Sequence, residues 1–362
     1  MDSESREGDV SVLRPLILVG LVLIVAFGIR QWRTAGPSEE NGADRSEPYV
    51  REFPILGTYA SLKLWAPASM AEPAADAAVS ELVSLHRLIN IFSDKSELSR
   101  LNDSAYDSPF PCSASLWQVL GVCREAYRET DGAFDITVGP LLQLWGFHRE
   151  RETLPTDREV SDALAAVGLD KVVFDDERRT VRFTHPDTYF DLGGMAKGYA
   201  LDFCVRILRA HGIDRGLVDL GGNIYCLSEP PPGQEAYRIG VRHPFEQYGL
   251  LGKIRIRDRA VATSGNYEQF REIEGQRVHH IIDPRTGRPV PRVASVTVVT
   301  PSGIDSDVYA TAVFVAGESM VKALRERSPE ASVLRVRQGD RAETVVERYG
   351  AIWDDIENGR TE

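Results

Sequence analysis

The chain has 362 residues, a formal net charge of -12 at pH 7 and a hydrophobic content of 43%. This length is enough for one large domain or two small ones, and the composition is that of a globular protein. The acidic balance argues against a nucleic-acid partner, which would need a basic face. An anionic ligand would have to be bound by a local device, such as a metal ion or a helix terminus.

The N-terminal part predicts attachment to a membrane. Pro15 to Ile29 is an unbroken apolar run, with Arg14 before it and Arg30 and Arg33 after it. A signal-peptide core is an alternative, but no small-x-small cleavage site follows cleanly, which favours an uncleaved signal anchor. We therefore expect a cytoplasmic stub and a signal-anchor transmembrane helix in 1–33 and a flexible linker in 34–48. Basic residues at both ends leave the orientation open.

The folded domain is predicted at 49–350, followed by a polar C-terminal tail at 351–362. Its first half alternates helices with short strands. We expect a strand pair at Phe53–Trp65, interrupted at Gly57-Thr58. A hairpin is expected from the strands Lys171–Phe174 and Thr180–Phe183, with its turn at Asp175-Asp176. Apolar residues at helical spacing predict helices at Pro73–Ile91, Leu116–Thr130, Asp157–Val167 and Met195–His211.

The second half is dominated by strands. They are predicted at Gly216–Leu220, Ile224–Leu227, Tyr237–Val241, Gly252–Ile256, Ala260–Thr263, Gln276–Ile282 and Ala294–Val299. Two helices follow, at Asp307–Val315 and Ser319–Arg327. The hairpin-like spacing of the strands predicts an α+β fold with mainly antiparallel sheets and flanking helices.

The four cysteines give no metal signature. Cys112, Cys123, Cys204 and Cys226 contain no CxxC pair, so a zinc site is not expected. Cys123 and Cys204 fall on helical patterns and are most simply core residues. A disulfide between Cys112 and Cys123 stays open, because spacing alone does not decide it.

The segment from Asp191 to Asp202 carries the strongest local signal. It predicts a buried strand that ends in the Asp191 carboxylate, then Gly193 and Gly194, then an amphipathic helix. Two glycines at such a junction let backbone approach a ligand, and helix N-terminal N–H groups favour an anion. Lys197 falls in the first helical turn, where it opposes the helix dipole. A phosphate would explain it; a tight turn with a solvated lysine is the alternative.

Three further turns could line a cleft. In Gly132–Pro140, Phe134 could pack a flat ring and Asp135 could meet polar ring atoms, or Asp135 could simply cap a helical turn. Asp219–Asn223 and Ala262–Tyr267 place small residues at strand ends. Turn chemistry explains each alone, but their repetition at strand ends is unusual.

Two segments could carry chemistry. His279 and His280 are adjacent on a predicted strand, so only one of them can face a given cleft, where it could act as an acid or base. Asp307 and Thr311 are four residues apart on a predicted helix, so their oxygens share one face and could hold Mg²⁺. Helix capping by Asp305 or Asp307 is the alternative.

Together these segments resemble the ApbE family, the FAD:protein FMN transferases. The resemblance runs from Leu56-Gly-Thr58 to Val315. It includes Ser96–Asn102, Gly132–Leu144 with Trp145-Gly-Phe147, Asp191–Asp202, Val218–Gly222, Ala262–Tyr267, His280–Gly287 and Asp307–Thr311. Leu56, Phe92 and Asn223 depart from the residues most frequent in the family, and no lipidation cysteine is present.

The resemblance implies a bilobed, T-fold-like α+β domain with FAD in the cleft between lobes. It implies that FAD contacts Leu56, Phe92, Ala133, Phe134, Asp135, Asp191, Lys197 and Ile281. It implies Mg²⁺ held by the carbonyl of Gly194 and the side chains of Asp307 and Thr311. His280 matches the family histidine linked to transfer and is a candidate base; Lys197 would neutralise phosphoryl charge or anchor the cofactor.

The implied reaction is Mg²⁺-dependent transfer of FMN from FAD to a Thr or Ser hydroxyl of a target protein, with release of AMP. The expected acceptor is a subunit of a membrane redox complex, such as sodium-pumping NADH:quinone reductase or an Rnf-type complex. The expected location is the inner membrane, single-pass, with the catalytic domain periplasmic. Two alternatives stay open: a Mg²⁺-dependent FAD pyrophosphatase giving FMN and AMP, and a non-catalytic FAD carrier.

Overall fold

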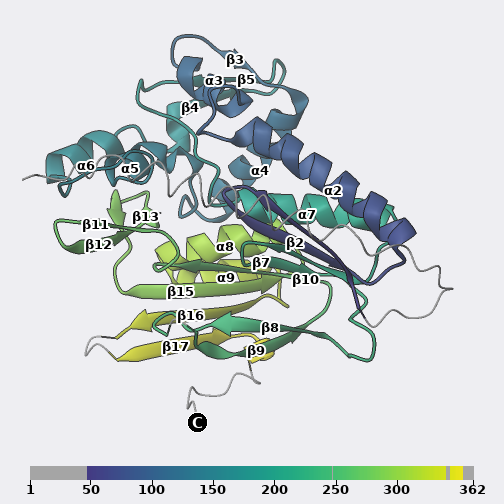
Figure 1. Ribbon diagram of the computed structural model, residues 1–362. Helices are drawn as coiled ribbons and strands as arrows, with labels where there is room; N and C mark the ends of the chain where they lie inside the picture. The colour runs from purple at the N-terminus through teal and green to yellow at the C-terminus, as the bar shows by residue number, and fades with distance from the viewer. Residues whose placement is uncertain (1–46, 247, 340–342, 354–362) are drawn as a thin grey trace, which may run out of the picture. The chain divides into compact units, whose positions relative to one another are not determined.

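A computed structural model describes residues 47–246, 248–339 and 343–353 (Figure 1). These residues all belong to one compact unit, Asp44–Glu362. The predicted anchor at 1–33 and nearly all of the 34–48 linker lie outside the described residues. Among the helices that are described, none has the length and apolarity to cross a membrane.

The centre of the domain is one antiparallel sheet of eight strands. Their order is β1-β2-β6-β7-β10-β15-β16-β17, and every neighbouring pair is antiparallel. The strands are β1 (Tyr49–Ile55), β2 (Thr58–Leu64), β6 (Gly216–Leu220), β7 (Asn223–Cys226), β10 (Arg259–Gly265), β15 (Val293–Thr300), β16 (Ser332–Gln338) and β17 (Thr344–Tyr349). The predicted antiparallel α+β class is therefore correct.

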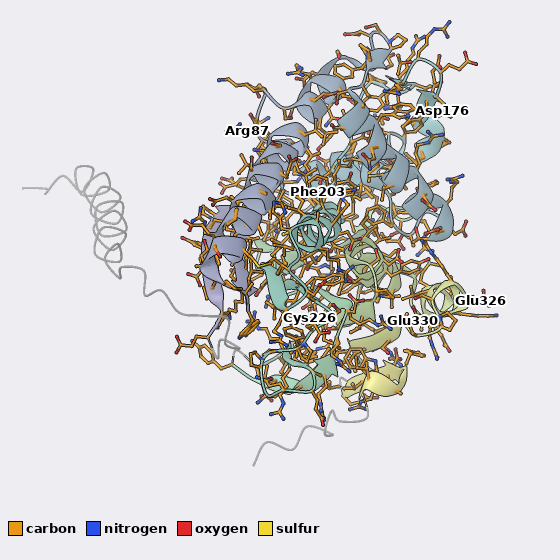
Figure 2. All side chains as sticks on the ribbon, turned by 90° about the vertical axis from the view of Figure 1, so that its right-hand side faces the viewer. Arg87, Asp176, Phe203, Cys226, Glu326 and Glu330 are labelled. Atoms are coloured by element: carbon orange, nitrogen blue, oxygen red, sulfur yellow. The ribbon has the colours of Figure 1, made fainter. Side chains whose placement is uncertain are left out.

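Both faces of this sheet are covered. The main hydrophobic core joins the sheet to α2 (Ala68–Ile89), α7 (Ala196–Ala210), α8 (Gly303–Ala316) and α9 (Glu318–Arg327). A second core joins the other face to the hairpin β8 (Tyr237–Arg242) and β9 (Leu250–Ile256). Successive side chains of β10 point to opposite faces of the sheet: Ala260 and Ala262 belong to the first core, and Val261 belongs to the second. Figure 2 shows the helix layer, with Phe203 on α7, above the sheet layer with Cys226.

Smaller elements complete the helix side. α3 (Glu97–Ser104) and α4 (Ala114–Glu129) accompany a three-stranded sheet of β3 (Phe110–Pro111), β5 (Thr180–Phe183) and β4 (Val172–Asp175). A third core gathers residues of α5 (Gly139–Leu144), α6 (Asp157–Leu164), β11 (Phe270–Ile273), β12 (Gln276–His279) and β13 (Ile282–Asp283), which pairs with β14 (Arg288–Pro289). Short 3-10 helices lie at η2 (Ile136–Val138), η3 (Leu169–Lys171) and η4 (Ala351–Trp353).

Several predicted boundaries shift. The helix predicted from Asp307 begins at Gly303, because the Ser302 hydroxyl caps it by accepting from the Asp305 N–H at 3.2 Å. Asp307 therefore lies one turn inside α8 and does not cap it. The predicted strand Gln276–Ile282 is broken at His280-Ile281. Folded structure continues past residue 350, since Trp353 is only 1% exposed in the second core.

One further expectation is corrected, and one open question is answered. No strand forms before Asp191, because a side chain takes the place of a neighbouring strand: Asn102 Nδ2 donates to the Phe190 carbonyl at 2.9 Å, and Asn102 Oδ1 accepts from the Phe190 N–H at 2.8 Å. Cys112 and Cys123 are both free thiols, and Cys123 instead packs its sulfur 3.7 Å from that of Met195.

Candidate active site

The predicted site residues meet in one pocket of about 600 Å³. Each residue expected to bind FAD, to hold the metal or to act in catalysis lines it: Leu56, Phe92, Ala133, Phe134, Asp135, Asp191, Gly194, Lys197, His280, Ile281, Asp307 and Thr311. A volume of this size is typical of small-molecule and cofactor sites. In contrast, Asp219–Asn223 forms the tight turn between β6 and β7 and does not line the pocket.

The floor of the pocket is the crossing of α7 and α8. The Gly198 N–H, in the first turn of α7, donates to Oδ2 of Asp307 at 2.8 Å. A Cβ at Gly198 would lie 2.4 Å from the Gly303 carbonyl oxygen and 2.6 Å from the Asp307 Cβ, so only glycine allows this approach. The anion at the start of α7 is therefore the Asp307 carboxylate from the neighbouring helix.

The N-terminus of α8 is held by α7 in turn. The Asp202 carboxylate accepts from the Gly303 N–H, from the Ile304 N–H at 3.1 Å and from the Ser302 hydroxyl at 2.8 Å. These contacts satisfy orphan N–H groups of the first helical turn. They fix the rotation of α8, and with it the direction in which Asp307 and Thr311 point.

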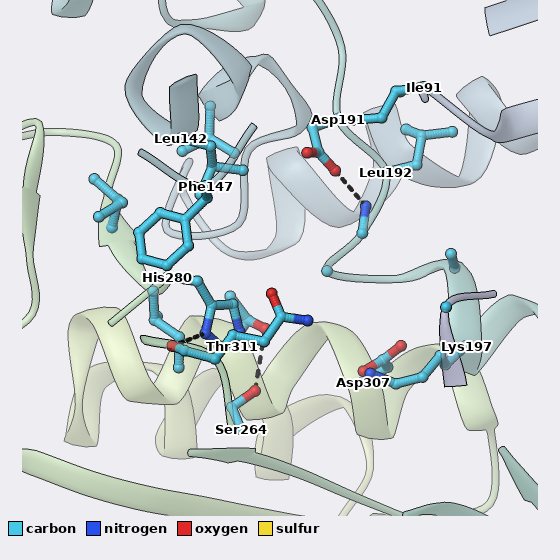
Figure 3. Close-up of a pocket in the computed structure, with 18 of the residues that line it drawn as sticks. Ile91, Leu142, Phe147, Asp191, Leu192, Lys197, Ser264, His280, Asp307 and Thr311 are labelled. Atoms are coloured by element: carbon cyan, nitrogen blue, oxygen red, sulfur yellow. Dashed lines mark hydrogen bonds between the residues drawn. The ribbon is translucent and has the colours of Figure 1, made fainter. Parts of the chain in front are cut away.

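Asp307 and Lys197 form the charged end of the pocket (Figure 3). Burial raises the pKa of the Asp307 carboxyl, and the nearby Lys197 ammonium opposes this rise. A side-chain hydrogen bond from Asn223 also opposes the rise, so the buried carboxylate has polar support while it lines the pocket. Thr311 lies one turn further along α8, and its hydroxyl is 3.3 Å from that of Ser264 on β10.

These donors fit a hard cation. A carboxylate oxygen, hydroxyls and a backbone carbonyl such as that of Gly194 are the oxygen ligands that Mg²⁺ accepts in proteins, usually together with substrate phosphates. By their chemistry, these residues fit Mg²⁺ as the ion that the pocket would hold.

His280 has a defined tautomer. Its Nδ1 lies 3.1 Å from the Gln269 carbonyl oxygen, which can only accept, so Nδ1 carries the proton. The Nε2 lone pair is then free to accept a proton from a reactant. Burial, together with the nearby His279 and Lys197, lowers the pKa of His280 to about 4, although the Gln269 hydrogen bond and the Asp191 charge oppose the shift. Near neutral pH the imidazole is thus an unprotonated base.

Glu268 lines the same end of the pocket and gave no signal in the sequence. Enclosure by the pocket raises the pKa of its carboxyl to about 7; the Lys197 charge opposes this shift and the Asp307 charge adds to it. At this end of the pocket, the Lys197 ammonium thus faces two carboxyl groups, Glu268 and Asp307, and partly compensates their charges.

The apolar walls account for the other predicted contacts. Gly194 packs on Phe134, where an added Cβ would be 3.1 Å from the ring.

Asp135 caps η2, because its Oδ1 accepts from the N–H and the hydroxyl of Thr137 at 2.8 and 2.7 Å. The capping alternative is therefore correct, and Asp135 also lines the pocket. Leu56 adopts a φ of 50° in the β1–β2 turn, and Phe92 is 74% exposed at the pocket.

The chain is similar to proteins of known activity. A model of the ApbE family matches residues 56–334. The chain belongs to the ApbE family. It is 31% identical over 264 residues to the FAD:protein FMN transferase of Escherichia coli K12, covering 71% of this chain and 75% of the relative. It is 37% identical over 252 residues to that of Vibrio cholerae, covering 68% and 74%.

Solved ApbE structures share the fold. The structure of the Thermotoga maritima ApbE protein superposes with a TM-score of 0.77 at 30% identity, over 86% of this chain and 100% of the other. The flavin transferase ApbE from Vibrio cholerae gives a TM-score of 0.75 at 30% identity, over 86% and 99%. These matches show that the chain has the fold of the family.

Proposed function

We propose that this protein transfers FMN from FAD to a Thr or Ser hydroxyl of an acceptor protein and releases AMP. One observation carries the proposal: Asp307 and Thr311 present oxygens to the same pocket in which Lys197 and the unprotonated His280 lie. Cation ligands, a fixed positive charge and a base are the groups that phosphoryl transfer to a hydroxyl requires. Family membership and the names of the relatives support the same activity.

The reaction can be written with this chain's residues. His280 Nε2 accepts the proton of the acceptor hydroxyl as its oxygen attacks the phosphorus of the FMN half of FAD. The bond from that phosphorus to the bridging oxygen breaks, and AMP leaves with the electron pair. Lys197 offsets the negative charge on the phosphoryl oxygens. The flavin ring is carried unchanged, so no redox step is needed.

A magnesium ion would be held by Asp307, Thr311 and the Gly194 carbonyl. When bound, it supplies neutralisation of the phosphoryl charge. The protein's part is to hold the ligands ready: the Gly198 N–H fixes one Asp307 oxygen at 2.8 Å, and Asp202 fixes the start of α8.

The cellular setting is part of the proposal. The apolar run at Pro15–Ile29 would anchor the chain in the inner membrane with the domain on the periplasmic side. The acceptor would then be a subunit of a membrane redox complex, of the sodium-pumping NADH:quinone reductase or Rnf type, whose modified hydroxyl faces the same side.

The test separates transfer from its two alternatives. The full-length protein is incubated with FAD, Mg²⁺ and a complex subunit that carries an acceptor threonine. Flavin fluorescence on the acceptor in a denaturing gel, with one AMP for each flavin, supports transfer. AMP without labelled acceptor would establish a pyrophosphatase, and neither product would establish a carrier; either result refutes the proposal.

A further inference from the structure

His148 lines the pocket but was not predicted from the sequence. It follows the Trp145-Gly-Phe147 motif directly. Its Nε2 lies 2.7 Å from Oδ2 of Asp191, and its Nδ1 lies 2.8 Å from the hydroxyl of Tyr189. The side chains of His148 and Asp191 are only 14% and 11% exposed. Both ring nitrogens therefore have a close partner in a largely enclosed place.

The partners determine which atoms carry protons. The Tyr189 hydroxyl donates to the Gly139 carbonyl at 2.6 Å, and a carbonyl can only accept. Burial, and then the charge of Asp191, raise the pKa of Tyr189, so the phenol keeps its single proton. Because the Tyr189 proton is donated to the Gly139 carbonyl, Nδ1 of His148 must donate to the Tyr189 oxygen. The Asp191 carboxylate accepts from Nε2. With Asp191 as a carboxylate, these contacts are satisfied together when both ring nitrogens carry a proton.

Tyr189 is a rigid partner. Its ring lies against Gly139, where an added Cβ would be 2.4 Å from a ring carbon. Because Gly139 begins α5, the phenol is fixed to a helix and cannot turn to a different acceptor without losing the 2.6 Å bond. Tyr189 therefore fixes Nδ1 of His148 relative to α5, and Nε2 of the same ring contacts Asp191.

Asp191 is held on both carboxylate oxygens. Oδ1 accepts from the Gly193 N–H at 2.7 Å, drawn in Figure 3, while Oδ2 accepts from His148. Each carboxylate oxygen can accept more than one hydrogen bond, so both retain acceptor capacity toward the pocket. Phe92 packs edge-on against His148, with 5.9 Å between the ring centroids. Tyr189, His148 and Asp191 are called the clamp below, and its members His148 and Asp191 line the pocket.

We propose that His148 is a positioning residue, held as an imidazolium between Tyr189 and Asp191, that aims the Asp191 carboxylate at an N–H or O–H donor of the bound flavin dinucleotide. The proposal rests on FAD being the ligand of this pocket. It assigns to His148 and Tyr189 a role in binding the dinucleotide and none in the transfer step, which takes place at the Lys197 and Asp307 end.

Substitutions test this role in binding. His148→Leu removes a charged hydrogen bond to Asp191 and should raise KM for FAD about tenfold, with kcat changed about threefold or less. His148→Gln keeps a neutral donor and should recover part of the loss. Tyr189→Phe leaves Nδ1 without its acceptor and should raise KM about threefold. FAD dissociation constants, measured by flavin fluorescence without Mg²⁺, should follow the same order. His211→Gln, at an exposed histidine outside the pocket, is the matched control.

The charge state has its own signature. In protein labelled with ¹⁵N-histidine at neutral pH, one ring should show two protonated nitrogens, and that signal should vanish in His148→Gln but persist in His211→Gln. A neutral His148 ring, or unchanged FAD affinity in folded His148→Leu and Tyr189→Phe, would overturn the inference. If the wild type binds FAD through this clamp yet labels no acceptor, the proposed function fails and the clamp stands.

Discussion

At the scale of single residues, Asp307 serves both structure and chemistry. Its Oδ2 ties α8 to α7 through the Gly198 N–H, and the same carboxylate lines the pocket where a cation would be held. Asp307→Asn keeps the size of the side chain and an oxygen for Gly198 but removes the charge. We expect transfer to fall at least about a hundredfold because the phosphoryl charge is no longer neutralised.

Mg²⁺ titration by calorimetry and gel labelling check this prediction together. The melting temperature of Asp307→Asn should not fall, because the neutral amide removes a buried charge. FAD should still bind without the metal. A fully active Asp307→Asn protein would show that the metal assignment is wrong.

His280 predicts a pH profile. The base is active when unprotonated, and the pKa of about 4 means that kcat/KM should stay level from about pH 8 to about pH 5 and fall only as pH approaches 4. An ordinary histidine with a pKa of 6.5 would lose activity about 2.5 pH units earlier as the pH falls. Initial rates of acceptor labelling across this range, corrected for protein that unfolds, give the measurement. A fall centred near 6.5 would contradict the account.

The same shift affects stability with a defined sign. Between pH 6.5 and about 4, His280 is largely protonated in the unfolded chain but largely unprotonated in the folded protein. The stability contribution of His280 should therefore be present above 6.5 and decrease as pH falls toward 4. Comparison of the free energy of unfolding of wild type and His280→Gln isolates it from Glu268, whose raised pKa acts in the opposite direction.

At the scale of elements, the crossing of α7 and α8 sets the geometry of the site. Gly198→Ala forces a Cβ to within 2.4 Å of the Gly303 carbonyl oxygen, so the helices must move apart and carry Asp307 with them. We expect a loss of about 1–3 kcal/mol of stability. Weaker Mg²⁺ binding should accompany it, because Asp307 loses its position.

The matched control is Gly121→Ala in α4, where an added Cβ meets nothing within 4 Å. That change should raise stability by about 0.5–1 kcal/mol, because alanine favours the helix over glycine. Thermal melts and Mg²⁺ titrations of both variants make the comparison. Equal effects at the two positions would refute the importance of the crossing.

At the scale of the whole domain, the sheet is closed on its second face by β8, β9 and Trp353. Trp353 is 1% exposed and its indole N–H donates to the Tyr349 carbonyl at 3.0 Å. Trp353→Ala should cost about 3–5 kcal/mol, as large-to-small core changes do. KM for FAD should be unchanged at low temperature, because Trp353 does not line the pocket. Urea unfolding and steady-state kinetics check both parts; Trp353→Phe should recover most of the stability.

What the sequence predicted well was local. Phe134, Asp135, Lys197, His280, Asp307 and Thr311 were singled out from short segments and all line one pocket, whereas Leu56, Phe92 and Ile281 were implied only by the family resemblance. The long-range supports were not predictable. Asn102 meets Phe190 across 88 residues and His148 meets Asp191 across 43, and neither pair has a periodic signature. β16 was missed even though its buried Val333, Leu334 and Val336 offer a strand signal.

A crystal grown with FAD and Mn²⁺ tests the metal assignment directly, because the anomalous scattering of Mn²⁺ gives its position. We predict a manganese peak within coordination distance of the Asp307 carboxylate, the Thr311 hydroxyl and the diphosphate of FAD. A diphosphate bound away from these oxygens, or a peak at other ligands with this site occupied only by water, would contradict it.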